Sequence, residues 1–175
     1  MAETRGLRGS VLEEMINMSN EIYRNKGLAL IQKVPTPITP INIDKESRHI
    51  TLAYFDRKST VDYIGVVQGV PVCFDAKECH SDNFSLQNLH EHQLSFMRDF
   101  EKQDGISFIL LYYTHRDEKY YIPFKDIEKF ADRAAGGGIK HFKYEEIDHS
   151  YRISSKNGVP VHYLEMLGRD LEGRD

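Results

Sequence analysis

Apolar positions recur at helical spacing in three segments of the chain. SVLEEMINMSNEIYRNKG begins at Ser10, which can cap a helix, and Glu13 completes a capping-box pattern. SLQNLHEHQLSFMRDFEKQDG starts with Ser85 as a possible cap and reaches Gly105 beyond its end. KDIEKFADRAAGGG stops at a triple glycine. We therefore expect three helices, and we interpret the acidic residues of the first one as first-turn charges, with Glu13 kept as an outside candidate for a site.

Other segments have the patterns of strands. HITLAYF alternates between apolar and polar positions, and VDYIGVVQGVPVCFDAKE (61–78) predicts two strands joined by a turn near Gln68 and Gly69. ISFILLYY is a continuous apolar run, typical of a central strand covered on both faces, and KYYIPF is expected to pair with it. The order of helices and strands predicts an α/β or mixed α+β fold in a single domain, residues 1–175.

Two segments depart from these patterns. VPTPITPINI contains three prolines, which exclude a helix or a central strand and predict an extended arm that projects from the domain or connects its parts. The polar tail DLEGRD is expected to be frayed. We therefore predict flexible termini at about residues 1–9 and 168–175.

Composition narrows the class of protein. With 175 residues and 40% hydrophobic content the chain can bury a core, and it contains no apolar run long enough to span a membrane and no secretion signal. A cytoplasmic location is therefore expected. The net charge is −4, but residues 1–60 carry nine Lys or Arg against seven Asp or Glu, whereas residues 61–175 carry fourteen against twenty. Contacts with a polyanion should therefore favour the N-terminal third.

Candidate chemistry lies in the predicted hairpin. Asp75 and Lys77 are two positions apart, so they share one face of a strand, and Asp62 on the neighbouring strand can approach them if the turn lies near Gly69. Two carboxylates suit a Mg²⁺ or Mn²⁺ ion, and a fixed ammonium can stabilise charge on a phosphate. The spacing D-x12-D-x-K also occurs by chance, and a surface ion pair between Asp75 and Lys77 is the simpler alternative. The apolar flanks favour a site, because buried charges are costly.

The pattern D-x12-[D/E]-x-K resembles the PD-(D/E)XK nuclease superfamily. Ordered blocks along most of the chain are similar to the RecU-type Holliday junction resolvases of bacteria and phages: LEEMINMSNEIYRNKGLALIQKVPTPI, AYFDRKSTVDYIGVVQG, FDAKE, FSLQNLHEHQLSFM, DGISFILLYY and VPVHYLEML. The resemblance implies a restriction-endonuclease-like core, with a central mixed sheet flanked by helices. It also implies a projecting stalk at about residues 35–50.

The resemblance also implies roles for particular residues. Asp62, Asp75 and Lys77 take the catalytic positions, and Asp62, Asp75 and Gln93 take those of the metal ligands, with Mg²⁺ as the cofactor and Mn²⁺ as a possible substitute. The implied assembly is a homodimer on four-way junction DNA, with a recombinase or a branch-migration helicase as a possible partner. The resemblance and the charge distribution together suggest a set of DNA-binding residues. They are Arg24, Lys26, Lys33, Arg48, Arg57, Lys58, Ser59 and Thr60.

The chain departs from the family pattern at several points. Val61 replaces the proline before the first aspartate, and Asp75 replaces a glutamate, whose longer side chain would place its carboxylate differently. Only Arg5 and Arg8 precede the first helix, where family members carry a longer basic arm. We expect these departures to affect the preference for a metal, the rate of cleavage and the affinity for duplex arms.

Three functions therefore remain open. The first is an endonuclease that resolves four-way junctions by paired symmetric nicks. The second is a less selective endonuclease of restriction type, and the third is a non-cleaving factor that binds DNA, anneals strands or modulates a recombinase. We do not expect His90 and His92 to share a metal ion, because two positions along a helix are about 200° apart.

Overall fold

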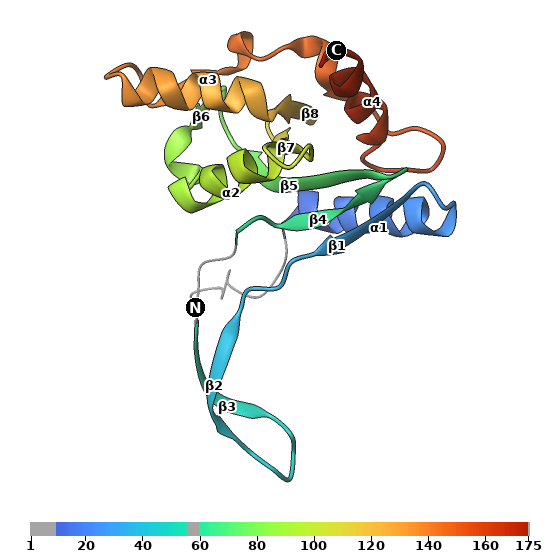
Figure 1. The fold of residues 1–175 in the computed structure, drawn as a ribbon, viewed down its shortest axis with the longest axis vertical. Coiled ribbons are helices and arrows are strands. Elements are labelled where there is room, and N and C mark those ends of the chain that lie inside the picture. The colour runs from blue at the N-terminus through green and yellow to red at the C-terminus, as the bar shows by residue number, and fades with distance from the viewer. Residues whose placement is uncertain (1–9, 56–59, 175) are drawn as a thin grey trace.

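A computed structural model describes residues 10–55 and 60–174, which form a central sheet, helices and a projecting ribbon (Figure 1). Six strands make the sheet, in the order β1-β4-β5-β7-β8-β10. They are β1 (Ala29–Lys33), β4 (Tyr63–Val67), β5 (Val70–Cys79), β7 (Ile106–Tyr113), β8 (Glu118–Pro123) and β10 (Arg152–Ile153). Neighbouring strands are antiparallel except β5 and β7, which are parallel. The expected mixed α+β class, with a central mixed sheet flanked by helices, is confirmed.

Helices cover both faces of this sheet. The helices are α1 (Val11–Asn25), α2 (Glu91–Glu101), α3 (Phe124–Ala135) and α4 (Leu164–Glu172). Because side chains alternate along a strand, Phe74 of β5 packs in the core beneath α1 and α4, whereas Cys73 packs beneath α2 and α3. Within the described residues, no helix has the length and apolar character that crossing a membrane requires.

Helix α1 forms as the capping pattern predicts. The Ser10 hydroxyl accepts a hydrogen bond from the Glu13 N–H, and the Glu13 carboxylate accepts one from the Ser10 N–H, each at 3.2 Å. Gly27 follows the helix with φ of +65°, a conformation that glycine adopts without strain. This reciprocal cap fixes the first turn of α1 against the sheet.

The hairpin between β4 and β5 also forms where it is predicted. Gln68 and Gly69 have φ of +48° and +89°, as a two-residue hairpin turn requires. The pairing runs from Val67 opposite Val70 to Tyr63 opposite Phe74. This register brings Asp62, the residue before β4, opposite Asp75.

The proline-rich arm is one strand of a two-stranded ribbon that extends away from the sheet (Figure 1). Its strands are β2 (Ile38–Ile43) and β3 (Ile50–Phe55). The expected stalk of residues 35–50 is therefore too short, because HITLAYF supplies the second strand of the ribbon and does not join the central sheet. Its large apolar side chains are exposed, and they are Ile38, Ile41, Ile43, Ile50, Leu52, Tyr54 and Phe55.

The second predicted helix starts later than expected. Ser85 caps a short 3₁₀ helix, η1 (Leu86–Asn88), and the backbone is then extended at Leu89 and His90 before α2 begins. The short strands β6 (Asn83–Ser85) and β9 (His141–Lys143) pair outside the main sheet. Two more 3₁₀ turns, η2 (Tyr144–Glu146) and η3 (His149–Tyr151), lead to β10.

The C-terminal segment is ordered, so the prediction of a frayed tail over residues 168–174 is wrong. Asp170 of α4 is fully buried and accepts a hydrogen bond of 2.7 Å from the Tyr121 hydroxyl. Arg174 pairs with Asp170 at 3.1 Å and with Glu101 at the end of α2 at 2.6 Å. Tyr121 and Glu101 lie far away from the tail in the sequence, which is why the polar tail alone gives no sign of its burial.

We predict that Asp170→Ala lowers the free energy of unfolding by about 2–4 kcal/mol, because it leaves a buried hydroxyl and a guanidinium without their shared acceptor. Chemical denaturation measures this change. Glu172→Ala, on the exposed side of the same helix, is the matched control and should stay within about 0.5 kcal/mol. Equal effects of the two substitutions would contradict the anchoring role of Asp170.

Candidate active site

The candidate site lies in a notch of the sheet, where β5 continues past the first residue of β4, Tyr63. Strand β5 pairs with β4 only as far as Phe74, whereas its pairing with β7 extends to Cys79. The peptide groups after Phe74 are therefore open toward the side where β4 would have continued. Asp62 occupies this opening.

Asp75 is the most enclosed group of the site, with a fully buried side chain. Its Oδ1 accepts a hydrogen bond of 2.9 Å from the Asp62 N–H. Its Oδ2 accepts one from the Gln93 amide and lies 2.9 Å from the Lys77 ammonium. The expectation that Asp75 and Lys77 share a face is thus confirmed, and the short aspartate reaches all three partners.

Asp62 is bound in return by the strand that carries Asp75. Its Oδ2 accepts a hydrogen bond of 2.9 Å from the Ala76 N–H, a donor that the notch leaves without a strand partner on that side. Burial raises the pKa of the Asp62 carboxyl from 3.8 to about 6, and the negative charge of Asp75 acts in the same direction. The Ala76 N–H and the Lys77 charge lower this pKa, without cancelling the increase.

Gln93 reaches the site from the first turn of α2 and is almost fully buried. Its Oε1 accepts a hydrogen bond of 3.1 Å from the His90 N–H, while its Nε2 donates to Asp75. The amide therefore caps α2 and holds Asp75 at the same time. A role as a metal ligand requires the amide to turn, so that Oε1 faces the carboxylates.

These side chains could hold a hard divalent cation. Two carboxylates and an amide are the oxygen donors that Mg²⁺ and Mn²⁺ prefer. In residues 10–55 and 60–174, no group of three or more His, Cys, Asp or Glu side chains is arranged to bind a metal. The Gln93 amide oxygen and water are donors that could complete a coordination shell around Asp62 and Asp75.

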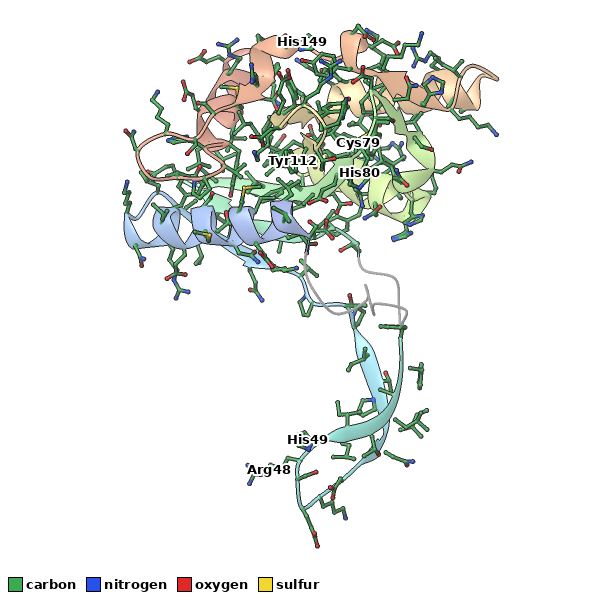
Figure 2. All side chains as sticks on the ribbon, turned by 180° about the vertical axis from the view of Figure 1, so that it is seen from behind. Arg48, His49, Cys79, His80, Tyr112 and His149 are labelled. Carbon is green, nitrogen blue, oxygen red and sulfur yellow. The ribbon has the colours of Figure 1, made fainter. Side chains whose placement is uncertain are left out.

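The predicted DNA-binding residues do not all lie near this notch. Lys33 does, because it pairs with Tyr63 across β1 and β4, and Thr60 is half-buried just before Asp62. Arg24 and Lys26 lie at the far end of α1 from Glu13, and Arg48 lies at the tip of the ribbon (Figure 2). Arg57, Lys58 and Ser59 lie outside the described residues.

The structure corrects the geometry on which the expectation for the two histidines was based, and it does not test whether they bind a metal. His90 precedes α2, so its ring is not on the opposite side of a helix from His92, and the two rings stack with centroids 5.4 Å apart.

Glu13 is closer to the site than its position on the helix alone suggested. Its carboxylate contributes to the raised pKa of Asp62 and lies 2.9 Å from the Lys33 ammonium.

We predict that Asp62→Asn stabilises the protein in metal-free buffer at pH 8. The pKa of Asp62 is higher in the folded state than in the unfolded state, so the folded state pays a penalty when the carboxyl ionises. This penalty is fully present above pH 6 and disappears below the unfolded value near 4, so the gain should be of the order of 2–3 kcal/mol at pH 8 and vanish at pH 3.5.

Denaturation curves for both proteins at the two pH values measure the difference. Asp99→Asn removes an exposed carboxylate whose ionic partner among residues 10–55 and 60–174 is Lys102, so this control should change stability by less than about 0.5 kcal/mol at either pH. A gain for Asp62→Asn that is the same at both pH values would contradict the origin assigned to it.

Comparison with known proteins places the chain in a family. The family model described as "Recombination protein U" matches residues 7–169. A protein of Oenococcus oeni named "Holliday junction resolvase RecU" is 39% identical over 167 residues, which cover 93% of this chain and 85% of that protein. A protein of the same name from Pediococcus pentosaceus is 36% identical over 172 residues, covering 95% and 86%.

Among solved structures, Hjc of Archaeoglobus fulgidus, a Holliday junction resolvase, aligns with a TM-score of 0.41 at 12% identity, over 79% of this chain and 86% of that one. This likeness is too low to add to the assignment. The family model and the RecU proteins, which match nearly the whole length, are sufficient: the chain belongs to the RecU family.

Proposed function

We propose that this protein is a metal-dependent endonuclease that resolves four-way DNA junctions by paired symmetric nicks, in recombination, repair or phage DNA processing. The observation that carries the proposal is the meeting of Asp62, Asp75, Lys77 and Gln93 in one notch of the sheet. The names of similar proteins, which are called Holliday junction resolvase, support the same proposal.

The catalytic roles follow from this arrangement. Asp62 and Asp75 would hold the cation together with Gln93, and Mg²⁺ is the expected ion, with Mn²⁺ as a substitute. When bound, such an ion lowers the pKa of a coordinated water and offsets charge on a phosphate oxygen. The Lys77 side chain is 20% exposed, so its ammonium is accessible to a phosphate while Asp75 keeps it in place, where it can orient the attacking water and stabilise the developing charge.

Contacts with DNA outside the notch would come from the N-terminal third. Lys33 and Thr60 lie nearest to the catalytic groups, and Arg48 would carry a positive charge on the ribbon toward the centre of a junction. The candidate residues Arg24 and Lys26 lie farther along α1, where a duplex arm could pass. Arg57, Lys58 and Ser59 complete the proposed set.

Paired nicks require two active sites, and we propose that the chain acts as a homodimer. Leu30 and Val66 are cross-strand neighbours on β1 and β4 with 60% and 46% exposure. They line a groove of about 370 Å³ together with Phe100 and Pro71. This patch and the apolar ribbon are joined through β1, and a second copy of the chain would cover both.

We also propose that the protein is located in the cytoplasm and that a recombinase or a branch-migration helicase is a further partner.

The two other candidate functions use the same surface differently. An endonuclease of restriction type would cut linear duplex as well, and a strand-annealing or recombinase-modulating factor would bind DNA without cutting it.

We predict that the protein nicks a labelled four-way junction symmetrically in Mg²⁺ or Mn²⁺, leaves the linear duplex of the same sequence intact, and is inactive in EDTA. Lys77→Ala should lower the cleavage rate by roughly 100-fold or more, because it removes the fixed ammonium. Lys102→Ala, an exposed lysine on the same side of the sheet, is the control and should cleave normally. Cutting of both substrates would favour the restriction-type enzyme, and binding without any nick would favour the non-cleaving factor.

We predict that Leu30→Glu dissociates the dimer, since it places a charge in the proposed apolar contact. Light scattering after size exclusion should show twice the mass of the chain for the original protein and the mass of one chain for the variant. Ile139→Glu alters a residue of similar exposure, 45%, in the loop after α3, and should leave the dimer intact. A monomer for the unaltered protein would overturn this part of the proposal.

A further inference from the structure

The outer edge of β8 is only partly covered by another strand. Strand β10 pairs with Lys119 and Tyr120, and toward Pro123 the chain beside β8 turns into η3. Alternate residues of a strand direct their N–H and C=O groups to alternate edges, so either Tyr121 or Ile122 faces this side. Within the described part of the chain, no hydrogen bond joins the backbone of these two residues to a turn or loop. The second half of β8 is therefore an open strand edge, which another strand can join.

A cavity of about 390 Å³ lies along this open edge. Tyr121 and Ile122 both line it, although their side chains pack in the cores on opposite faces of the sheet. The cavity therefore meets the edge of the strand between the two faces. Its other walls are the first turns of α3 and the segment that leads from η2 to η3. Exposed side chains of Lys129 and Asp148 at these walls show that the cavity opens to solvent.

One carboxylate in the cavity has no bound partner. Asp148 accepts a hydrogen bond of 2.9 Å from the Ser150 N–H, and Glu146 pairs with Arg133. Asp126, on the first turn of α3, is half-buried. Among residues 10–55 and 60–174, it accepts no hydrogen bond and forms no ion pair. Asp126 is thus the acidic group of the cavity that can accept a donor from another molecule.

The charge of the cavity favours a cation over a phosphate. Burial raises the pKa of the Asp126 carboxyl, and Lys125 and Lys129 oppose this increase without cancelling it. A cationic hydrogen-bond donor beside Asp126 would stabilise its charged form. The cavity is lined by three carboxylates and two lysines, which leaves one net negative charge. A basic side chain is therefore attracted to it, whereas the backbone of DNA is repelled.

We propose that this edge is a docking site for an extended segment of a partner protein, which pairs with β8 beyond Tyr120 and places an arginine or lysine side chain against Asp126. In such strand addition, main-chain hydrogen bonds provide affinity and a side-chain pocket provides specificity. Helix α3, which forms one wall, lies at the end of the domain away from the ribbon (Figure 1). Two strand positions separate β8 from β5, so a bound segment leaves the notch open. The inference goes beyond the proposed function, because docking here requires neither a metal ion nor the cutting of DNA.

A titration followed by nuclear magnetic resonance tests the site in the full chain, with the blocked peptide Thr-Val-Arg-Val-Thr as the probe. The amide signals of Tyr121 and Ile122 should shift on binding, whereas that of Lys77 at the notch should not. Asp126→Asn should weaken binding roughly 10-fold, the loss expected for one charge-assisted hydrogen bond. Asp132→Asn removes an exposed acid farther along α3, outside the cavity, and should leave the affinity unchanged.

Two further peptides separate the basic side chain from the strand pairing. A peptide with glutamate in place of the arginine, and one that keeps the arginine but is methylated on its backbone nitrogens, should each bind at least 10-fold more weakly. Equal binding of all three peptides would overturn the inference. So would an unchanged affinity of Asp126→Asn, or an arginine peptide that shifts no signal of β8 at millimolar concentration.

Junction cleavage distinguishes this inference from the proposed function. The cleavage rate should be the same with and without the bound arginine peptide, since the notch remains open. Inhibition by the peptide would place it at the notch and contradict docking at β8. A protein that binds the peptide at β8 but cuts no junction would remove the proposed function alone.

Discussion

The site depends on a pair of reciprocal hydrogen bonds between two chain segments. The Asp62 N–H donates to the Asp75 carboxylate, and the Ala76 N–H donates to the Asp62 carboxylate. The Asp75 carboxylate is thereby bound to the backbone of Asp62, and the Asp62 carboxylate is bound to the backbone next to Asp75. The two charges therefore stay close in spite of their repulsion. This arrangement is possible because β4 begins only at Tyr63 and leaves the Ala76 peptide open. The position of this strand end is therefore as important to the proposed chemistry as the acidic residues themselves.

Local patterns made part of this arrangement predictable. The two-residue period and the turn at Gln68 and Gly69 place Asp75, Lys77 and Asp62 together without knowledge of the rest of the fold. Gln93 could be predicted only through the family resemblance, since an amide in a helix has no local signal for a buried role. The burial of Asp170 depends on its contact with Tyr121, and the pairing of Glu13 with Lys33 depends on how α1 docks on the sheet. Such contacts join distant parts of the chain, and periodicity does not report them.

Strand β5 serves both faces of the sheet at once. Asp75 and Lys77 point toward α2 and carry the proposed chemistry, whereas Glu78 points toward α1 and holds its N-terminus. A shift of β5 by one residue would exchange these roles and bury the wrong side chains on both sides. The parallel pairing with β7 over eight residues, from Val72 to Cys79, opposes such a shift. The pairing of β5 with β7 in the middle of the sheet thus fixes the positions of Asp75, Lys77 and Glu78.

The parallel pairing of β5 with β7 affects the order in which the site assembles during folding. Two parallel neighbours require a crossover, and here the crossover contains α2, which delivers Gln93 to Asp75. The β4–β5 hairpin is a local structure that can form early, but the amide arrives only when a long-range connection has closed. Until that connection has closed, the Gln93 amide cannot reach Asp75. The proposed metal site is therefore assembled only when the parallel pairing at the centre of the sheet is in place.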